Sequence, residues 1–265
     1  MTLIVSWIGV DDKKEGKSIA SIYLASDSRY SWNTNTKYNY GQKVFGASSY
    51  PEIFSFCGDV LFPVSAITQM ISQIDNHLLI NEVDNAEAKS IKIFEYLNTS
   101  LYSYPKPCMA SGFSILYATR VEKNFSLFRY YYTNKLEYEE IALPNISTKV
   151  YSGGSGSAEF DTNWLQCDHE KNNNHRTSRA VYHCLSETIR NIKDPQTGGL
   201  PQVVGLYRIN NARLFGIVEN GKKYIFGKEA SPKISSQNIE WRNGNFERID
   251  HNTLQRIEGA QVQPF

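Results

Sequence analysis

Short stretches of apolar residues recur along the chain with the two-residue alternation or the β-rich composition of strands. Residues 2–10 and 18–26 are two such stretches, and the polar segment between them contains Gly16, which predicts a β-hairpin. Residues 43–47 and 52–57 alternate in polarity around a turn and predict a second hairpin. Further strands are predicted over residues 113–119, 125–133, 136–141, 149–151, 203–209, 213–218 and 223–226, with Asn220-Gly221 as a hairpin turn.

Helical periodicity lies in two parts of the chain. Apolar residues recur every three or four positions over residues 60–74, and residues 88–101 form a second amphipathic stretch. A third helix is expected to begin at Ser157, and a fourth covers about residues 177–192. The apolar stripe of the fourth helix places Cys184 in the core and turns His183 away from it.

The order of these elements is strands, two helices, strands, two helices and strands. Two antiparallel sheets packed face to face, each covered by a helix pair, would bury every apolar face in that order. The sequence therefore predicts an α+β fold, a four-layer αββα sandwich. We expect one domain over residues 1–265, with a core at residues 2–227 and a C-terminal extension at residues 228–265 whose role is open. Residues 30–42 read as a polar loop.

The charge and hydropathy of the chain exclude several classes of partner. The 265 residues include 28 basic and 27 acidic side chains, a net charge of +1, so no nucleic-acid partner is expected. No stretch approaches the ~18 continuous apolar residues of a membrane span, and the N-terminal run lacks the basic start of a signal peptide. We therefore expect a cytoplasmic protein with no membrane partner.

The four cysteines, Cys57, Cys108, Cys167 and Cys184, contain no Cys-x-x-Cys pair, which favours free buried thiols over a disulfide framework. The densest set of metal-ligating residue types follows this order along the chain: Cys167, Asp168, His169, His175, His183 and Cys184. Its spacing fits no common zinc pattern, and the residues within it read as an exposed loop. No metal or cofactor is expected.

Thr2 directly follows the initiator Met1. Methionine is normally removed when the next residue is as small as threonine, which would leave Thr2 with a free α-amine beside its hydroxyl. An N-terminal amine can act as the base that activates such a hydroxyl nucleophile. Many proteins carry threonine at this position without any catalytic role, so the interpretation depends on residues elsewhere in the chain.

Four places further along the chain offer side chains that could assist such a nucleophile. Asp27 ends the second predicted strand and Lys43 opens the third. A buried lysine would supply positive charge near the hydroxyl, and an aspartate beside it would keep the lysine protonated and in place. Ser155 lies in a glycine-serine turn, and Asp194 and Thr197 precede Gly-Gly after the fourth helix. Taken singly, a solvated ion pair, a flexible loop and a helix stop would explain them.

Together these residues resemble those of the proteasome β-subunits, threonine peptidases of the N-terminal-nucleophile hydrolase superfamily, and of their bacterial homo-oligomeric relatives. The resemblance covers roughly residues 2–227 and lies in the order and spacing of the motifs. It implies a catalytic set of Thr2, Asp27, Lys43, Ser155, Asp194 and Thr197, and gives Gly58 the backbone N–H that binds the oxyanion. Thr197 stands where the family usually has serine, the first hairpin is longer, and the tail has no counterpart.

The resemblance further implies an endopeptidase that works inside a homo-oligomeric ring on peptides or unfolded proteins, with an ATP-driven unfoldase or activator as partner. An apolar primary substrate pocket would be lined by Tyr30, Gly41, Phe45, Phe56 and Val60. Core packing explains the two phenylalanines equally well. Two alternatives stay open: a hydrolase of small amides, and a non-catalytic ring or scaffold subunit.

Overall fold

The structure is a computed structural model, and it describes residues 2–13, 16–32, 35–105, 108–109, 111–169, 176–231 and 239–260. The long antiparallel hairpin that the sequence predicts is formed by β1 (Ile4–Lys13) and β2 (Gly16–Ser26), and it belongs to the larger of two main sheets. The other strands of this eight-stranded sheet are β10 (Thr148–Gly153), β11 (Gln202–Tyr207), β12 (Arg213–Glu219), β13 (Lys222–Ile225), β14 (Lys228–Glu229) and β15 (Ile239–Arg242). The strand order is β10-β1-β2-β11-β12-β13-β14, with β15 paired to β12.

The second sheet has five strands in sequence order, all antiparallel. It contains β5 (Val44–Gly46), β6 (Glu52–Gly58), β7 (Phe113–Val121), β8 (Asn124–Tyr132) and β9 (Leu136–Ile141). The segment expected to be a polar loop instead holds a small ladder of β3 (Tyr30–Ser31) and β4 (Lys37–Tyr38). Two residues per strand are too few to produce a readable alternation.

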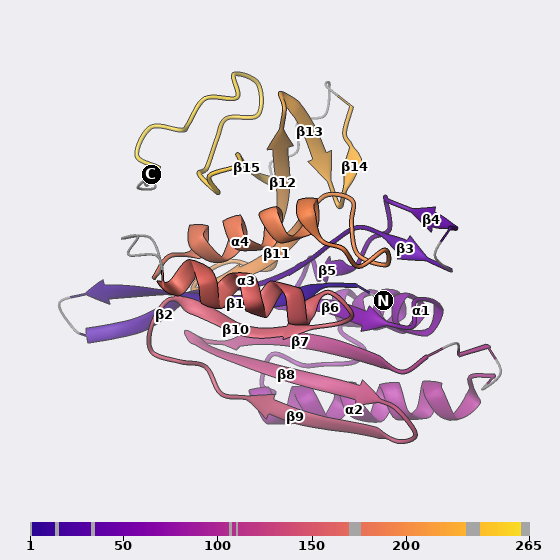
Figure 1. Cartoon of the computed structure of the whole chain (residues 1–265). Coiled ribbons are helices and arrows are strands. Elements are labelled where there is room, and N and C mark those ends of the chain that lie inside the picture. Colours follow the sequence, from indigo (N-terminus) through magenta and orange to yellow (C-terminus); the bar gives the residue numbers. More distant parts are fainter. Residues whose placement is uncertain are drawn as a thin grey trace.

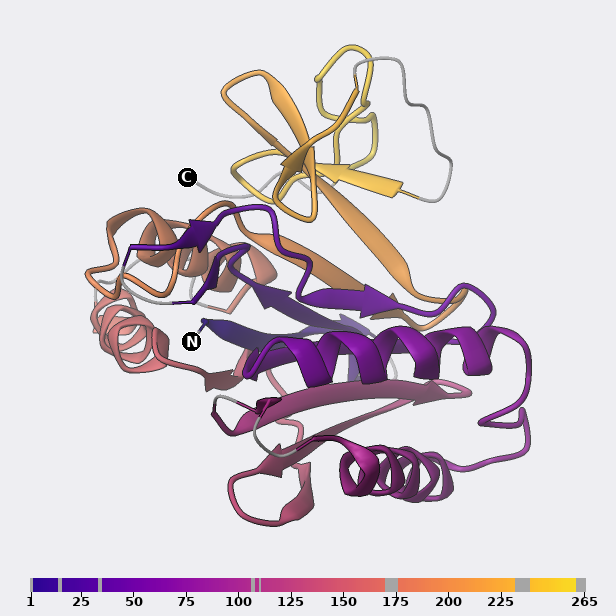
Figure 2. The ribbon, with the colours of Figure 1, turned by 90° about the vertical axis from the view of Figure 1, so that its right-hand side faces the viewer.

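Three apolar clusters hold these elements together. One lies between the sheets and contains side chains such as Leu24 of β2 and Leu116 of β7. A second joins the five-stranded sheet to α1 (Leu61–Asp75) and α2 (Ala86–Ser103). The third joins β1, β2, β11 and β12 to α3 (Ser157–His169) and α4 (Ser178–Asn191), where Phe160 and Leu185 are fully buried. Figure 2 shows α1 and α2 in the lower half of the molecule, away from the C-terminal strands.

The predicted α+β class and four-layer αββα sandwich are wrong for this chain. The described residues form fifteen strands and only four helices, so the structure is mostly β. The eight-stranded sheet curls into a half-barrel, and β12, β13 and β14 extend beyond α4 (Figure 1). The helices therefore do not cover the sheets as predicted, because β14 and β15, which the sequence pattern did not indicate, extend the eight-stranded sheet.

The packing of β15 explains part of this difference. It pairs in parallel with β12, so that Trp241 lies opposite Gly216. A Cβ on Gly216 would stand 2.3 Å from the Trp241 ring, so only glycine allows this approach. The predicted turn at Asn220-Gly221 is confirmed between β12 and β13, with φ of +49° and +72° at the two residues. None of the helices in the described part of the chain is long and apolar enough to span a membrane.

Candidate active site

The β1–β2 hairpin brings the residues before β1 and after β2 to the same place. Ile4 pairs with Ser26, so Leu3 lies beside Asp27. The Leu3 N–H donates to Asp27 Oδ1 at 3.0 Å, and the Asp27 N–H donates to the Leu3 carbonyl at 3.2 Å. Asp27 is fully buried and Thr2 is only 1% exposed. Two residues 25 positions apart in the chain thus share one buried site.

Lys43 connects these two residues. Its Nζ donates to Thr2 Oγ1 at 2.6 Å and to Asp27 Oδ1 at 2.8 Å, and the lysine has no exposed surface. Burial lowers the pKa of the Lys43 ammonium below that of an exposed lysine, although the Asp27 carboxylate acts in the opposite direction. An ammonium with a lowered pKa shares its proton more readily with an oxygen at hydrogen-bond distance, and that oxygen is the Thr2 hydroxyl.

The second oxygen of the Asp27 carboxylate is also satisfied. Its Oδ2 accepts the N–H groups of Arg29 at 3.1 Å and Gly198 at 2.9 Å. With Leu3 and Lys43 on Oδ1, the carboxylate accepts four hydrogen bonds. These bonds offset the cost of burying the charge and fix the position of the carboxylate that holds Lys43.

Ser155, Asp194 and Thr197 form a second group at the backbone nitrogen of Thr2. The Thr2 N–H donates to Ser155 Oγ at 3.2 Å. The hydroxyls of Ser155 and Thr197 donate to Asp194 Oδ2 at 2.5 Å and 2.8 Å. Burial alone would raise the pKa of Asp194, but hydrogen bonds from Ser155, the Gln196 N–H and Thr197 outweigh it and lower the pKa. Since the Ser155 proton points to Asp194, the Ser155 oxygen accepts from the Thr2 nitrogen.

The backbone of the glycine-serine turn lies close to Thr2, because the turn has glycine at positions 154 and 156. Gly154 has φ of +92°, and a Cβ there would stand 2.0 Å from the Thr2 carbonyl oxygen. The Gly156 N–H donates to that same oxygen at 3.2 Å. The turn therefore holds the backbone of Thr2 from one side while Lys43 holds its hydroxyl from the other.

Gly58 lies at the end of β6, next to this group. Its φ is +95°, and a Cβ there would stand 2.2 Å from the Gly112 carbonyl oxygen, so glycine is required. The preceding residue, Cys57, also borders this site. Its Cβ would lie 3.3 Å from a Cβ placed on Gly154, the same position that would clash with the Thr2 carbonyl oxygen. The end of β6 thus borders the Thr2 site, while the oxyanion role of Gly58 stays a prediction.

Two further residues, Gln202 and Arg29, support the site, and the sequence pattern does not indicate them. Gln202, only 1% exposed, accepts the Lys43 N–H at 2.9 Å and donates to the carbonyls of Asp27 at 3.1 Å and Gly41 at 2.7 Å. Arg29 donates to the carbonyl oxygens of Pro195 at 3.1 Å and Thr197 at 2.9 Å. The only sequence signal is their nearness to the motifs, since a glutamine opening a strand and an arginine in a loop are ordinary.

The residues expected to line a substrate pocket fall into two environments. The Tyr30 ring lies against Gly41, where a Cβ would be 2.5 Å away, and Lys43 Nζ is 5.8 Å from the ring centroid. Phe45 and Phe56 are buried in the cluster shared with α1, with ring centroids 6.4 Å apart, and Val60 packs against that cluster. Tyr30 and Gly41 therefore border the Thr2 site, and the substrate-binding role of all five stays a prediction.

The structure describes only some of the candidate metal ligands and cysteines. His175 and the side chains of Cys167, Asp168 and His169 lie outside the described residues. Within the described ranges, no three His, Cys, Asp or Glu side chains are arranged to hold a metal ion. Cys184 is buried and His183 exposed, as predicted from the helix stripe. Cys57 is also buried, but Cys108 is exposed, so the expectation of buried thiols is wrong for that residue.

No protein-family model matches this chain, and a comparison with curated proteins gave no match either. A functional interpretation therefore depends on the buried hydroxyl, ammonium and carboxylate described above. A hydroxyl bonded to a buried lysine, with its backbone nitrogen held by a serine–aspartate pair, has the parts needed for nucleophilic attack on a carbonyl.

Proposed function

We propose that this protein is a threonine-type endopeptidase that hydrolyses peptide bonds with Thr2 as an N-terminal nucleophile. The observation that supports this most strongly is the buried chain from Thr2 Oγ1 through Lys43 Nζ to Asp27 Oδ1, with distances of 2.6 Å and 2.8 Å. Structural ion pairs are common, but one that ends on the hydroxyl of residue 2 has no evident structural purpose.

The proposed reaction begins with the removal of Met1, which converts the Thr2 nitrogen into a free amine. That amine, directly or through a water molecule, takes the proton from Thr2 Oγ1 as the oxygen attacks the substrate carbonyl. The tetrahedral oxyanion accepts the Gly58 N–H, an interaction worth about 3–4 kcal/mol in other acyl-transfer enzymes. The protonated amine then gives its proton to the departing peptide nitrogen, leaving an ester on Thr2 that water hydrolyses.

The surrounding residues have separate tasks in this scheme. Lys43 stabilises the deprotonated Thr2 oxygen through its positive charge, and Asp27 keeps Lys43 in place. Ser155 and Asp194 hold the Thr2 nitrogen, and the Thr197 hydroxyl fixes Asp194. Since all of these groups are present and connected, an active enzyme explains the site better than a non-catalytic ring subunit does. Following the resemblance, we propose a cytoplasmic homo-oligomeric ring that acts with an ATP-driven unfoldase or activator.

The test compares fluorogenic peptides with small acyl amides as substrates of the purified protein and of Thr2→Ala. Thr162→Ala is the control, because Thr162 is an exposed residue of α3. We expect peptide hydrolysis by the parent and the control, none by Thr2→Ala, and an intact mass without Met1. Turnover of small amides alone would replace the peptidase proposal by an amidase. Retained Met1 in the active protein, or full activity in Thr2→Ala, would overturn the proposed nucleophile.

A further inference from the structure

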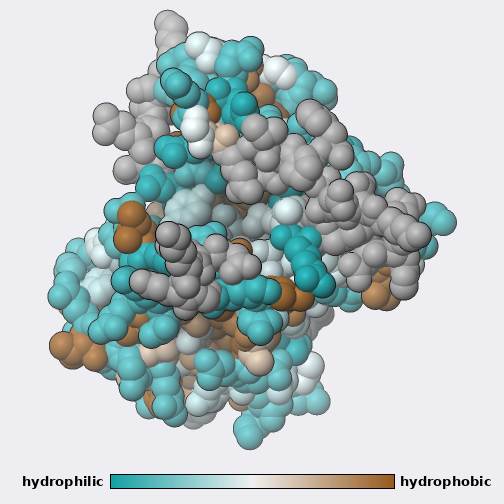
Figure 3. Space-filling model, turned by 90° about the vertical axis from the view of Figure 1, so that its left-hand side faces the viewer, coloured by the Kyte–Doolittle hydropathy of each residue, from teal (hydrophilic) through white to brown (hydrophobic). Residues whose placement is uncertain are grey.

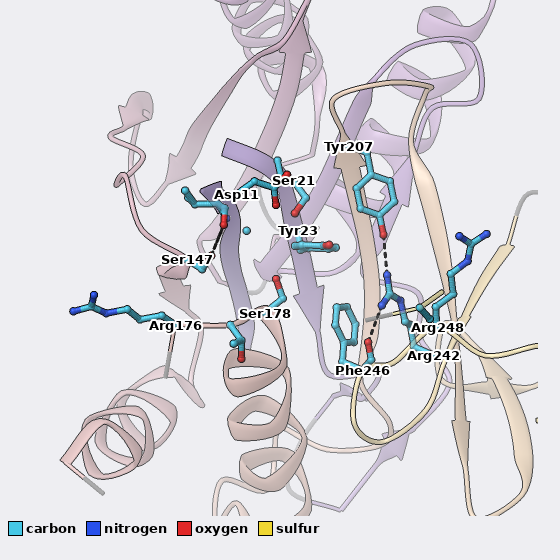
Figure 4. A pocket seen from close by; sticks show the side chains of 15 residues that line it. Asp11, Ser21, Tyr23, Ser147, Arg176, Ser178, Tyr207, Arg242, Phe246 and Arg248 are labelled. Atoms are coloured by element: carbon cyan, nitrogen blue, oxygen red, sulfur yellow. Dashed lines mark hydrogen bonds between the residues drawn. The ribbon is translucent and has the colours of Figure 1, made fainter. Parts of the chain in front are cut away.

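A cavity of about 420 Å³ lies at the opposite end of β1 and β2 from Thr2. It is bordered by these two strands, the start of α4, the end of β11 and the C-terminal segment after β15 (Figure 4). On this side the surface is hollowed between the C-terminal strands and the rest of the protein, and hydrophilic residues predominate (Figure 3). Its volume is within the range of small-molecule sites. The proposed peptidase reaction does not use this cavity.

Two hydroxyl groups, those of Ser21 and Ser178, line the cavity close to Gly9. A Cβ on Gly9 would stand 2.6 Å from Ser21 Oγ and 3.4 Å from Ser178 Oγ, so the missing side chain leaves both hydroxyls accessible. Ser21 is only 5% exposed, and it lines the cavity. Hydroxyl groups that line a cavity can donate hydrogen bonds to a bound anion.

The charged residues around the cavity are mostly cationic. The lining includes Arg176, Arg242 and Arg248 but only one carboxylate, Asp11, which is already paired with Arg208 at 2.9 Å. Arg242 contacts Glu240, and the same carboxylate is 3.9 Å from Arg248. One glutamate thus faces two guanidinium groups. The excess of positive charge favours an anionic ligand.

The wall of the cavity is aromatic and is completed by the C-terminal segment. Tyr23 and Phe246 are buried, with ring centroids 5.7 Å apart, and Tyr207 stands beside them. Arg242 donates to the Phe246 carbonyl and to the Tyr207 hydroxyl, as the dashed lines in Figure 4 show. Its buried Nε has no hydrogen-bond partner in the described part of the chain. Arg242 of β15 therefore adds a donor to the cavity, and Phe246 in the segment after β15 adds an apolar face.

We propose that this cavity binds a small molecule in which a phosphate or carboxylate group is joined to an apolar ring. The anionic group would accept the hydroxyls of Ser21 and Ser178, while the ring packs against Tyr23 and Phe246. In Figure 4 the side chains of Arg176 and Arg248 point away from the other labelled residues, and rotation about their side-chain bonds would bring the guanidinium groups toward a bound anion. A phosphate ligand and a carboxylate ligand of this kind share the same chemistry, an oxyanion attached to an aromatic ring.

Isothermal titration calorimetry with phenyl phosphate, benzoate and inorganic phosphate tests the proposal on the full chain. We expect phenyl phosphate or benzoate to bind more tightly than inorganic phosphate, and the better of the two identifies the anionic group. Gly9→Ala places a methyl group over the two serines, and Arg176→Ala/Arg248→Ala removes charge from the rim. Each change should weaken binding by at least about tenfold, the value of one charge-assisted hydrogen bond.

Lys135→Ala is the matched control, because it removes an exposed positive charge from the turn after β8, away from the cavity. It should bind the probes as the parent does. Ser21→Ala, which removes only one oxygen, provides a second test if Gly9→Ala does not fold. No binding of any probe, or equal weakening in the cavity variants and in Lys135→Ala, would overturn the proposal. Neither result would bear on peptide hydrolysis by Thr2.

Discussion

Replacing Lys43 with methionine separates the proposed catalytic role of this lysine from its structural role. Methionine is similar in length and apolar, so the core stays filled while the positive charge and both hydrogen bonds are lost. Asp27 then keeps a buried negative charge without its cation. Thr2 Oγ1 loses the donor that lies at 2.6 Å.

The expected loss of stability follows from the environment of Asp27. Removing one partner of a buried ion pair typically costs about 3–5 kcal/mol. The Asp27 carboxylate still accepts three backbone N–H groups, from Leu3, Arg29 and Gly198. We therefore expect the low end, about 3 kcal/mol. With a urea slope of about 3 kcal/mol/M, the unfolding midpoint should fall by about 1 M.

The expected loss of activity is larger than instability alone would produce. Removing one group that stabilises the developing charge typically lowers kcat by about 10²–10³. Peptide hydrolysis should therefore fall by that factor under conditions where urea titration shows the variant to be folded. KM should change little, because Lys43 is buried and contacts Thr2 Oγ1 rather than the exposed surface.

Lys89→Met is the matched control for this experiment. Lys89 is 4% exposed and forms an equally buried ion pair with Glu52 at 2.7 Å, but Glu52 lies at the opposite end of β6 from Gly58. Lys89→Met should lose a similar amount of stability and keep kcat within about threefold, since distant sites act independently. If Lys43→Met retains as much activity as Lys89→Met, the assigned role of Lys43 is wrong.

Three further predictions concern residues around Thr2. Gln202→Leu removes three buried hydrogen bonds and should cost about 3 kcal/mol or more in urea unfolding; a loss under 1 kcal/mol would contradict its positioning role. The lowered pKa of Asp194 contributes stability that is present above pH ~4 and lost as pH falls further, so the midpoint difference between the parent and Asp194→Asn should shrink from pH 7 to pH 3.5. Burial raises the pKa of the Cys57 thiol, so iodoacetamide at neutral pH should label the exposed Cys108 and leave peptidase activity intact, whereas inactivation through Cys57 would indicate a thiol nucleophile.

The sequence was sufficient for elements with long, regular patterns. The strands of the β1–β2 hairpin and the helix beginning at Ser157 lie where the alternation and the glycine-serine turn predict them. The arrangement of the larger sheet could not be predicted from the sequence. Its strand β15 has only four residues, and the parallel pairing of β15 with β12 depends on the contact between Trp241 and Gly216. Because the sequence does not reveal that pairing, it does not predict the curled half-barrel.

The residues of the candidate site are likewise predictable from the sequence only in part. The order of the motifs predicts Thr2, Asp27 and Lys43, and the structure joins them in one hydrogen-bonded chain. The sequence does not indicate Gln202 or Arg29, because they bind backbone carbonyls that only the folded chain brings together. Side-chain chemistry can be read from the sequence, whereas support by backbone groups depends on tertiary contacts.

The central claim, that Thr2 is the nucleophile, is tested most directly by trapping the acyl-enzyme. A peptide-based β-lactone acylates an activated hydroxyl, and peptide mass spectrometry locates the resulting ester. We expect one adduct per active chain, on Thr2 of a chain that has lost Met1, and no adduct in Lys43→Met over the same time. An adduct on Cys57, or an ester on Thr2 of a chain that retains Met1, would contradict the proposed mechanism.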